Sequence, residues 1–478
     1  MNRKRILFFN YMEKTHNLIK NPLLIFFLIV VGTIGSVWIL LSNEFYYIDE
    51  CAHYLYSRFV FQALPITVQL WHRPLPQWLF AVPAQFGHTF TMFFALALFL
   101  VLLFITWRIA VLHGIKHAEW VVLLVGLQPI LFDLSYACMT EMPAAFMIAL
   151  SYLYHLKGKH GLSLTLASAV FLCRTEMYLF AGVMFLFYAW KHEWKILPLV
   201  LTGPLLWICS SAVISGDVMS FFREWVAFSS IGKFIPGVSV THYFMHLHSI
   251  FGLTQVLLFA AGAGFIAARK RSAEFGIIYS TITLTLILHT LAGAEMFHWS
   301  ASIGELRYIG VVGPLFGIVS VYGFAEIADR VRPAAGQLLF SLIVLAGVAY
   351  QCTTETHPRR WANYERVVIN LTKEIRAEYP DLTLLSNHAV VAYIMDVPPC
   401  GGKHFARLTL KTLKQYPECI ILWDPFFSHS IFSQTKLTKE KLLQDTTIEV
   451  VDRYKYWSAE YLVLHKKANS ALTSGIDY

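Results

Sequence analysis

Residues 23–50 have the sequence LLIFFLIVVGTIGSVWILLSNEFYYIDE, in which a long apolar run is followed by a pair of acids. The first part, residues 23–41, carries no charge and is long enough to cross a bilayer as a helix. Basic residues at positions 3–5 precede it and no small-residue cleavage site follows it, so we expect a retained first span. Asp49 and Glu50 then lie just beyond the membrane, on the side opposite the basic N-terminus.

The composition indicates a membrane protein. Of the 478 residues, 56% are hydrophobic and only 14% are charged, and the mean hydropathy is +0.54. A soluble domain carries about 25% charged residues. The net charge of +8 comes from short basic clusters between apolar runs, a pattern typical of membrane topology that does not indicate a nucleic-acid partner. We therefore expect a polytopic protein in contact with membrane lipids.

Apolar run length predicts a mainly α-helical bundle of about eleven spans. We place them near residues 23–41, 76–107, 118–134, 142–156, 161–173, 177–190, 196–214, 247–268, 275–293, 307–325 and 334–351. The segments assigned to the cytoplasm hold sixteen Lys and Arg, against six on the other side of the membrane part. This bias predicts a cytoplasmic N-terminus and, with an odd span count, an extracytoplasmic C-terminal region. A bacterial inner membrane is the location we expect.

Some of these segments are interrupted. Residues 161–173 and 177–190 are short for ordinary spans, and we interpret them as two half-helices broken at residues 173–176. Such a break is tolerated only where the backbone lines protein or water. Residues 76–107 are interrupted at Pro83, which predicts a short lead-in helix before the span.

Residues 352–478 differ in character from the membrane part, residues 1–351. Charged residues become frequent and the apolar runs shorten to strand length. The strands that we predict are residues 382–385, 389–394, 420–423, 448–451 and 461–464. A helical pattern covers residues 366–379 and is stopped by Pro380. The sequence therefore predicts a small soluble α/β domain.

Acidic residues of the membrane part gather on its predicted outer side. They are Glu44, Asp49, Glu50, Asp133, Glu141, Glu176, Asp217, Glu224, Glu295 and Glu305. Acids at the membrane boundary are costly and usually have a function. A transporter would place its acids near the middle of its spans, and here the middles of the spans carry none.

The first outer loop carries the acids closest to a span. Asp49 and His53 are four residues apart and share one face of a helix. A carboxylate in the position of Asp49 can take a proton from a hydroxyl, while Glu50 or His53 can hold a substrate or a metal. A purely structural explanation, with helix-terminal acids and an interfacial histidine, stays equally open.

Two more clusters lie where spans begin or break. Thr140 and Glu141 precede Pro143, so they either cap a helix or contribute to a site. Arg174 and Glu176 lie at the break between the half-helices. They either close the break as an ion pair or act on a substrate.

The later outer segments supply bases and histidines. Lys233 is followed by His242 and His246, which have metal-ligand spacing on a helix, although interfacial histidines are more often only amphipathic. His298 precedes Arg307, which opens a span from the outer side. A guanidinium in that position suits a lipid-linked phosphate. Alternatively, the side chain only extends to the headgroups of the membrane lipids and binds no substrate.

These pieces, in this order, resemble the GT-C superfamily of membrane glycosyltransferases, which includes protein O-mannosyltransferases, lipid A aminoarabinose transferases and mannosyltransferases of glycolipid anchors. The resemblance covers residues 1 to about 350. It rests on Asp49-Glu50 in the first outer loop, Thr140-Glu141 at the start of a span, Leu172-Cys173-Arg174-Thr175-Glu176 in the half-helix segment, and Glu305-Leu306-Arg307-Tyr308 with Gly313-Pro314. Each motif is weak alone, but four in order on one side are moderately specific.

The resemblance implies a sugar donor on a polyprenyl phosphate and a hydroxyl acceptor on a lipid, glycan or protein. It assigns Asp49 as general base, with Glu50 as a second catalytic residue that positions a substrate. Phosphate leaves readily, whereas a hydroxyl is a poor nucleophile and needs a base. The leaving phosphate needs a cation, and Arg307 is best placed, with Arg174 or Lys233 as helpers. One base and no second nucleophile imply single displacement with inversion.

We expect the remaining site residues to bind the substrates. They are His53, Glu141, Arg174, Glu176, Lys233, His298, Arg307 and Tyr308. The sequence departs from the family at Cys51 and His53, where Arg or Tyr is usual. The first loop has no Asp-x-Asp, so we expect neither a cofactor nor a resident metal, although a divalent metal held by Asp49 or Glu50 stays open.

Three activities remain under consideration. A hexosyltransferase, with mannose among the sugars, is the first. An O-antigen-ligase-like enzyme would also use a polyprenyl-linked sugar, but it would place its Arg and His in one large late loop, and the loop at 215–246 is only moderate. A transporter or flippase predicts inverted repeats, which this sequence lacks.

Overall fold

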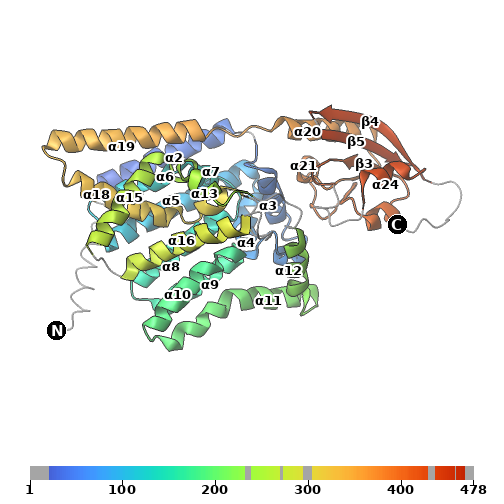
Figure 1. The fold of residues 1–478 in the computed structure, drawn as a ribbon. Helices are drawn as coiled ribbons and strands as arrows, with labels where there is room; N and C mark the ends of the chain where they lie inside the picture. The colour runs from blue at the N-terminus through green and yellow to red at the C-terminus, as the bar shows by residue number, and fades with distance from the viewer. Residues whose placement is uncertain are drawn as a thin grey trace.

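The computed structural model describes residues 21–42, 44–231, 238–269, 273–293, 304–428, 437–457 and 459–468. Figure 1 shows a helical bundle at one end of which lies a smaller domain built on a sheet. Helix α19 (Ala334–Glu355) runs along the bundle and leads into the smaller domain. The predicted boundary after residue 351 falls in the last turn of α19.

Within the described residues, five helices are long and apolar enough to cross a membrane. They are Pro22–Leu41 (α2), His88–Leu112 (α5), Trp194–Ser215 (η5 and α11), Phe275–Gly293 (in α16) and Ala334–Glu355 (α19). Four shorter apolar helices are His160–Leu172, Thr175–Trp190, Leu253–Ala268 and Gly313–Ala328. The protein is therefore an integral membrane protein, while the count of eleven spans stays a prediction.

Several spans expected from the sequence are divided into two helices. The lead-in helix α4 (Pro74–Gln85) precedes α5, as predicted, and the chain turns at Gly87 with a φ of 99°. The half-helices are α9 (His160–Ala169) and α10 (Tyr178–Trp190), with short 3-10 turns between them. The break predicted at residues 173–176 is thus confirmed.

The other helical elements complete the bundle. They are α3 (Ile48–Arg58), η2 (Leu64–Val68), α6 (Trp120–Gly126), α7 (Pro129–Leu134), α8 (Glu141–Leu156), η3 (Val170–Leu172), η4 (Thr175–Met177), η5 (Trp194–Leu201), α11 (Thr202–Ser215), α12 (Ser220–Ile231), α13 (His242–Met245), α14 (Leu247–Phe251), α15 (Leu253–Ala268), α16 (Ala273–Gly293), α17 (Arg307–Gly310) and α18 (Gly313–Ala328).

Helices α15 and α18 pack unusually closely. A Cβ atom built on Gly323 would lie 2.0 Å from the Leu258 carbonyl oxygen, and one on Gly262 would lie 2.2 Å from the Val319 oxygen. Only glycine fits both positions, which is how helices approach closely inside a membrane. This contact fixes α18, the helix that follows α17 and its Arg307.

The C-terminal domain is a five-stranded mixed sheet covered by helices. The strands are β1 (Thr383–Leu385), β2 (Phe405–Ala406), β3 (Cys419–Trp423), β4 (Ile448–Tyr456) and β5 (Ala459–Lys466), in the order β2-β1-β3-β5-β4. β1 is parallel to β2 and β3, whereas β5 is antiparallel to β3 and β4. The helices are α20 (Asn363–Glu378), α21 (Ala389–Ile394), α22 (Leu410–Gln415) and α24 (Lys439–Gln444).

One predicted strand is wrong. Residues 389–394 form helix α21, whose first turn is capped by the His388 side chain, which accepts a hydrogen bond from the Val390 N–H. A short apolar run does not by itself distinguish a buried strand from a buried helix. The other four predicted strands and the helix over residues 366–379 are confirmed, and the two-residue strand β2 was not predicted.

The C-terminal domain packs directly on helix α3. A single buried apolar cluster contains Tyr54 and Leu55 of α3 together with Val390 of α21. At the edge of this contact the guanidinium of Arg58 lies 2.9 Å from the carboxylate of Asp396. The helix that carries Asp49 is therefore held between the bundle and the smaller domain.

Candidate functional site

Asp49 and Glu50 occupy the first turn of α3, where the helix dipole favours negative charge. Neighbouring residues of a helix point about 100° apart, and the two carboxylates accordingly have different partners. Asp49 pairs with Arg307, whereas Glu50 pairs with Arg359. The acid pair of the first outer loop is thus divided between two environments.

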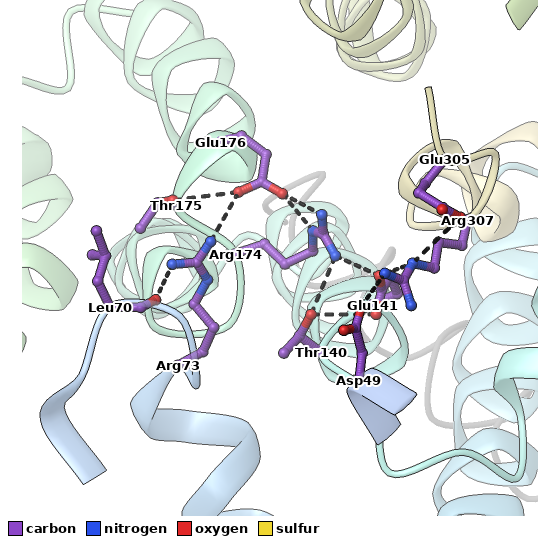
Figure 2. A network of polar contacts seen from close by, with 10 residues as sticks. All are labelled: Asp49, Leu70, Arg73, Thr140, Glu141, Arg174, Thr175, Glu176, Glu305 and Arg307. Atoms are coloured by element: carbon purple, nitrogen blue, oxygen red, sulfur yellow. Dashed lines mark hydrogen bonds and ion pairs between the residues drawn. The ribbon is translucent and has the colours of Figure 1, made fainter. Parts of the chain in front are cut away.

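Arg307 begins helix α17, and its side chain is only 6% exposed. Its Nη2 lies 2.5 Å from Asp49 Oδ2, and its Nε lies 3.6 Å from Glu141 Oε1. Glu305 is at the limit of an ion pair, 3.9 Å from the same Nε. One guanidinium therefore has three carboxylates around it (Figure 2).

A second guanidinium, that of Arg174, extends this group of charges. Arg174 Nη1 lies 2.6 Å from Glu141 Oε1, and Arg174 Nη2 lies 2.5 Å from Glu176 Oε1. Arg174 also donates to Thr140 Oγ1 at 3.2 Å. Arg73 ends the series, with its Nη2 3.8 Å from Glu176 Oε2.

The result is an alternating series of acids and bases, which we call the charge network (Figure 2). Its members in order are Asp49, Arg307, Glu141, Arg174, Glu176 and Arg73. They come from α3, α17, α8, the break between the half-helices, and the start of α4. Charges buried in this way are stable only when they are paired, so the network holds one end of each of these elements together.

Aromatic rings cover the two central guanidinium groups. The Tyr308 ring centre lies 4.5 Å from the Arg174 guanidinium and 5.6 Å from that of Arg307. The ring centre of Tyr47, the residue just before α3, lies 5.4 Å from the Arg307 guanidinium. His289 of α16 lies 5.4 Å from Tyr308 between ring centres and is fully buried. Rings beside guanidinium groups exclude water and strengthen the ion pairs.

Arg307 has unused donors. Among the described residues, its Nε and Nη1 are buried and have no hydrogen-bond partner. The carboxylates of Asp49 and Glu141 lie within ion-pair distance of Arg307, which keeps the guanidinium charged. Buried donors without a partner are costly and are often satisfied by a ligand or a water molecule.

The carboxylates of this region differ in exposure. The side chains of Glu141 and Glu176 are 1% and 10% exposed, so both carboxylates interact mainly with the neighbouring guanidinium groups. Asp49 and Glu305 are 30% and 33% exposed. An incoming molecule can therefore reach the two carboxylates that flank Arg307 but not the inner ones.

Glu50 lies apart from the network. Its carboxylate is fully buried, 3.0 Å from Arg359 Nη1 and 3.3 Å from His88 Nε2, and it accepts a hydrogen bond from the Cys138 N–H at 2.9 Å. Burial alone raises the pKa of this carboxyl, but Arg359 and His88 lower it to about 2. A fully enclosed carboxylate has no room for a substrate. The position of Glu50 therefore differs from the substrate-contacting position that the sequence predicted for it.

His53 lies on α3 one turn after Asp49 and is 7% exposed. Its ring stacks on Trp71 with 4.8 Å between centres and 1° between planes. Burial lowers the pKa of His53 to about 4, so the ring is neutral at pH 7. His53 is thus near the network but is packed as an uncharged aromatic.

Other predicted positions fall outside this group. Lys233 and His298 lie outside the described residues. His242 donates from Nε2 to the Gly304 carbonyl at 2.8 Å, and His246 donates from Nδ1 to the His242 carbonyl at 2.7 Å. In the described part of the chain, no group of three or more His, Cys, Asp or Glu is placed to hold a metal.

Two arginines of the site were missed from the sequence. Arg73 precedes a proline and has a φ of 64°, a left-handed conformation that nothing in the sequence indicates. Arg359 lies in a basic stretch that was assigned to the soluble domain. Their partners, Glu176 and Glu50, are distant in sequence, so no local pattern could pair them.

No protein-family model and no curated protein matches the chain. The crystal structure of ArnT from Cupriavidus metallidurans bound to undecaprenyl phosphate is similar, with a TM-score of 0.61 and 11% identity, over 94% of this chain and 99% of that one. The structure of the same ArnT in the apo state has a TM-score of 0.60 and 11% identity, over 93% of this chain and 98% of that one. The structure of the arabinofuranosyltransferase AftD from mycobacteria has a TM-score of 0.48 and 13% identity, over 93% of this chain and 40% of that one. The chain thus has a fold similar to that of ArnT, in agreement with the fold that the motifs predicted.

Proposed function

We propose that this protein is a membrane glycosyltransferase that moves a sugar from a polyprenyl-phosphate donor to a hydroxyl group of a lipid, glycan or protein. The similarity to ArnT, which was crystallised with undecaprenyl phosphate, supports the donor class. The charge network supports the location of the reaction. In this account the network end of the bundle is extracytoplasmic, the membrane is a bacterial inner membrane, and the sugar is a hexose such as mannose.

The observation that carries the proposal is the state of Arg307. Its guanidinium is buried and charged, and two of its donor nitrogens have no hydrogen-bond partner among the described residues. A phosphate oxygen matches such donors, because guanidinium and phosphate form paired, charge-assisted hydrogen bonds. Each buried donor without a partner costs about 1–3 kcal/mol, so a phosphate that accepts from these donors is stabilised by a similar amount.

Asp49 is the group that we assign as general base. In the reaction the acceptor oxygen bonds to the anomeric carbon while the bond from that carbon to the phosphate oxygen breaks. The acceptor proton passes to Asp49, and the electron pair leaves with the phosphate, which Arg307 stabilises. Asp49 is 30% exposed beside Arg307, so acceptor and leaving group meet across one ion pair. Single displacement inverts the anomeric carbon.

Glu305 is the alternative base. It is about as exposed as Asp49 and faces the same guanidinium. Its carboxylate oxygen lies 3.9 Å from Arg307 Nε, whereas that of Asp49 lies 2.5 Å from Arg307 Nη2. Glu141 and Glu176 are too buried to accept a proton from an acceptor. We assign them, with Arg174 and Tyr308, to holding Arg307 in place.

The test is a transfer assay on reconstituted protein. The donors are undecaprenyl-phosphate-linked hexoses and pentoses, the acceptor is a membrane extract, and the released undecaprenyl phosphate is measured by mass spectrometry. We expect Asp49→Asn to lower transfer by about 10²–10⁴-fold, because it keeps the shape but removes the base. Glu305→Gln should retain most activity. The opposite ranking reassigns the base to Glu305, and no release from any donor contradicts the proposed function.

A further inference from the structure

A second polar site lies at the other end of helix α18. Arg307 and α17 precede the start of α18 at Gly313, whereas Glu326 and the following residues end it. There a cavity of about 370 Å³ opens between the chain ends of α5, α15 and α18. Its charged and hydroxyl side chains are Lys116, Arg269, Tyr322, Glu326, Asp329 and Arg330.

The cavity contains more positive than negative charge. Lys116 Nζ lies 2.7 Å from Asp329 Oδ2. Arg269 and Arg330 share one carboxylate, that of Glu326, and the Arg330 contact is 2.8 Å. Among the described residues that line the cavity, three cations thus face two carboxylates, which leaves one positive charge.

Donor capacity is also left over. Among the described residues, the side-chain contacts of Arg269 and Arg330 use only Nη1 of each. A guanidinium has five N–H donors in a fork that fits phosphate in a bidentate manner. The side chains of Arg269 and Arg330 are 46% and 50% exposed, so a ligand can reach both, although one face of the Arg330 guanidinium lies over the Phe265 ring.

The position of the cavity matches the membrane boundary. Lys116 follows the end of α5, Arg269 immediately follows α15, and Asp329 immediately follows α18. All three helices are predominantly apolar along their length. The distribution of Lys and Arg predicts that this boundary is the cytoplasmic one.

We propose that this cavity binds the phosphodiester group of an anionic phospholipid. A phosphodiester carries one negative charge, which equals the excess in the cavity, and basic pockets between helices at this boundary are suited to lipid headgroups. Glu326 competes with the lipid for the two guanidinium groups. Inorganic phosphate has the same chemistry and is the alternative source of the anion. The proposal does not depend on the proposed transferase activity.

The experiment measures retained lipid and melting temperature in nanodiscs of phosphatidylcholine, with or without phosphatidylglycerol. The double variant Arg269→Gln/Arg330→Gln should retain about tenfold less phosphatidylglycerol than the wild type and lose its stabilisation. The matched control is Lys157→Gln/Lys159→Gln, on the same predicted side, where both ammonium groups lie over the Tyr154 ring. The control should behave as the wild type.

Glu326→Gln tests the proposal in the opposite direction. It removes the competing carboxylate, so phosphatidylglycerol retention should rise even if the double variant fails to fold. Retention that is unchanged in the double variant, or lower in Glu326→Gln, would overturn the site. Millimolar inorganic phosphate is added to the phosphatidylcholine sample in a separate arm. Full stabilisation there, with no preference for phosphatidylglycerol, would overturn the lipid assignment in favour of a free anion.

Discussion

The Glu50 carboxylate lies 3.0 Å from the Arg359 guanidinium, and both side chains are almost fully buried. The two residues are 309 positions apart. Arg359 also donates to the backbone carbonyl oxygens of Asp133 and Tyr136, and its own N–H donates to Ser42 Oγ at 2.8 Å. The segment between α19 and the C-terminal domain is therefore tied to the residues that precede α3 and α8, the helices that carry Asp49 and Glu141.

The first prediction concerns this pair. Breaking a buried ion pair by removing one partner costs about 3–5 kcal/mol, so Arg359→Met should loosen the start of α3. Cys138, whose N–H donates to Glu50, is buried and should become reactive to a thiol reagent. The measurement is the labelling rate of Cys138 in detergent, followed by mass spectrometry.

A matched control exists at the other end of α3. Arg58 and Asp396 also join α3 to the C-terminal domain, but their contact is more exposed. Arg58→Gln should leave Cys138 protected, because exposed ion pairs contribute little. Equal labelling in Arg58→Gln and Arg359→Met would mean that the domain contact in general, rather than the Glu50 pair, holds the loop.

The second prediction concerns pH. The pKa of His53 is about 4 in the folded protein and 6.5 for an ordinary histidine. Between these values the unfolded chain binds the proton first, so stability is present above pH 6.5 and is lost as the pH falls through about 4. The wild type should lose up to about 3 kcal/mol in this window, and His53→Gln should lose less.

Melting temperatures at several pH values between 4 and 7 check this expectation. His357→Gln, at an exposed position after α19, removes an imidazole elsewhere and serves as the control. The same pH slope in His53→Gln and in the wild type would show that another group controls acid stability.

Much of the site was predictable because charge is rare in this chain. Arg174 and Glu176 interrupt an apolar stretch, and Glu141 and Arg307 lie where spans begin, so few positions competed for the role. Their convergence follows from membrane topology, which places them on one side. The sequence could therefore predict that these residues converge at one end of the bundle, although not which acid pairs with which base.

Other features depend on tertiary contacts that no local pattern contains. The different positions of Asp49 and Glu50 follow from a partner 309 residues away from Glu50. Residues 389–394 have an apolar composition that suits a strand, but a histidine cap and packing against α3 make them a helix. In each case the deciding contact joins the bundle to the C-terminal domain.

The third prediction tests the orientation. Cys400 is an exposed thiol of the C-terminal domain, and Cys419 in the same domain is buried. A variant that keeps Cys400 as its only cysteine should react with a membrane-impermeant thiol reagent in intact cells. Labelling only after the membrane is opened would reverse the orientation and move the charge network to the cytoplasmic side.

If Arg307 holds the phosphate of a polyprenyl donor, its replacement should weaken the binding of undecaprenyl phosphate, which can be measured in nanodiscs. Arg307→Lys keeps the charge but loses the planar fork, so binding should weaken about tenfold or more. Arg223→Lys is the control, because Arg223 pairs with Asp217 at an exposed position outside the network. We expect wild-type affinity in the control. Undecaprenyl phosphate bound as tightly by Arg307→Lys as by the wild type would contradict the account.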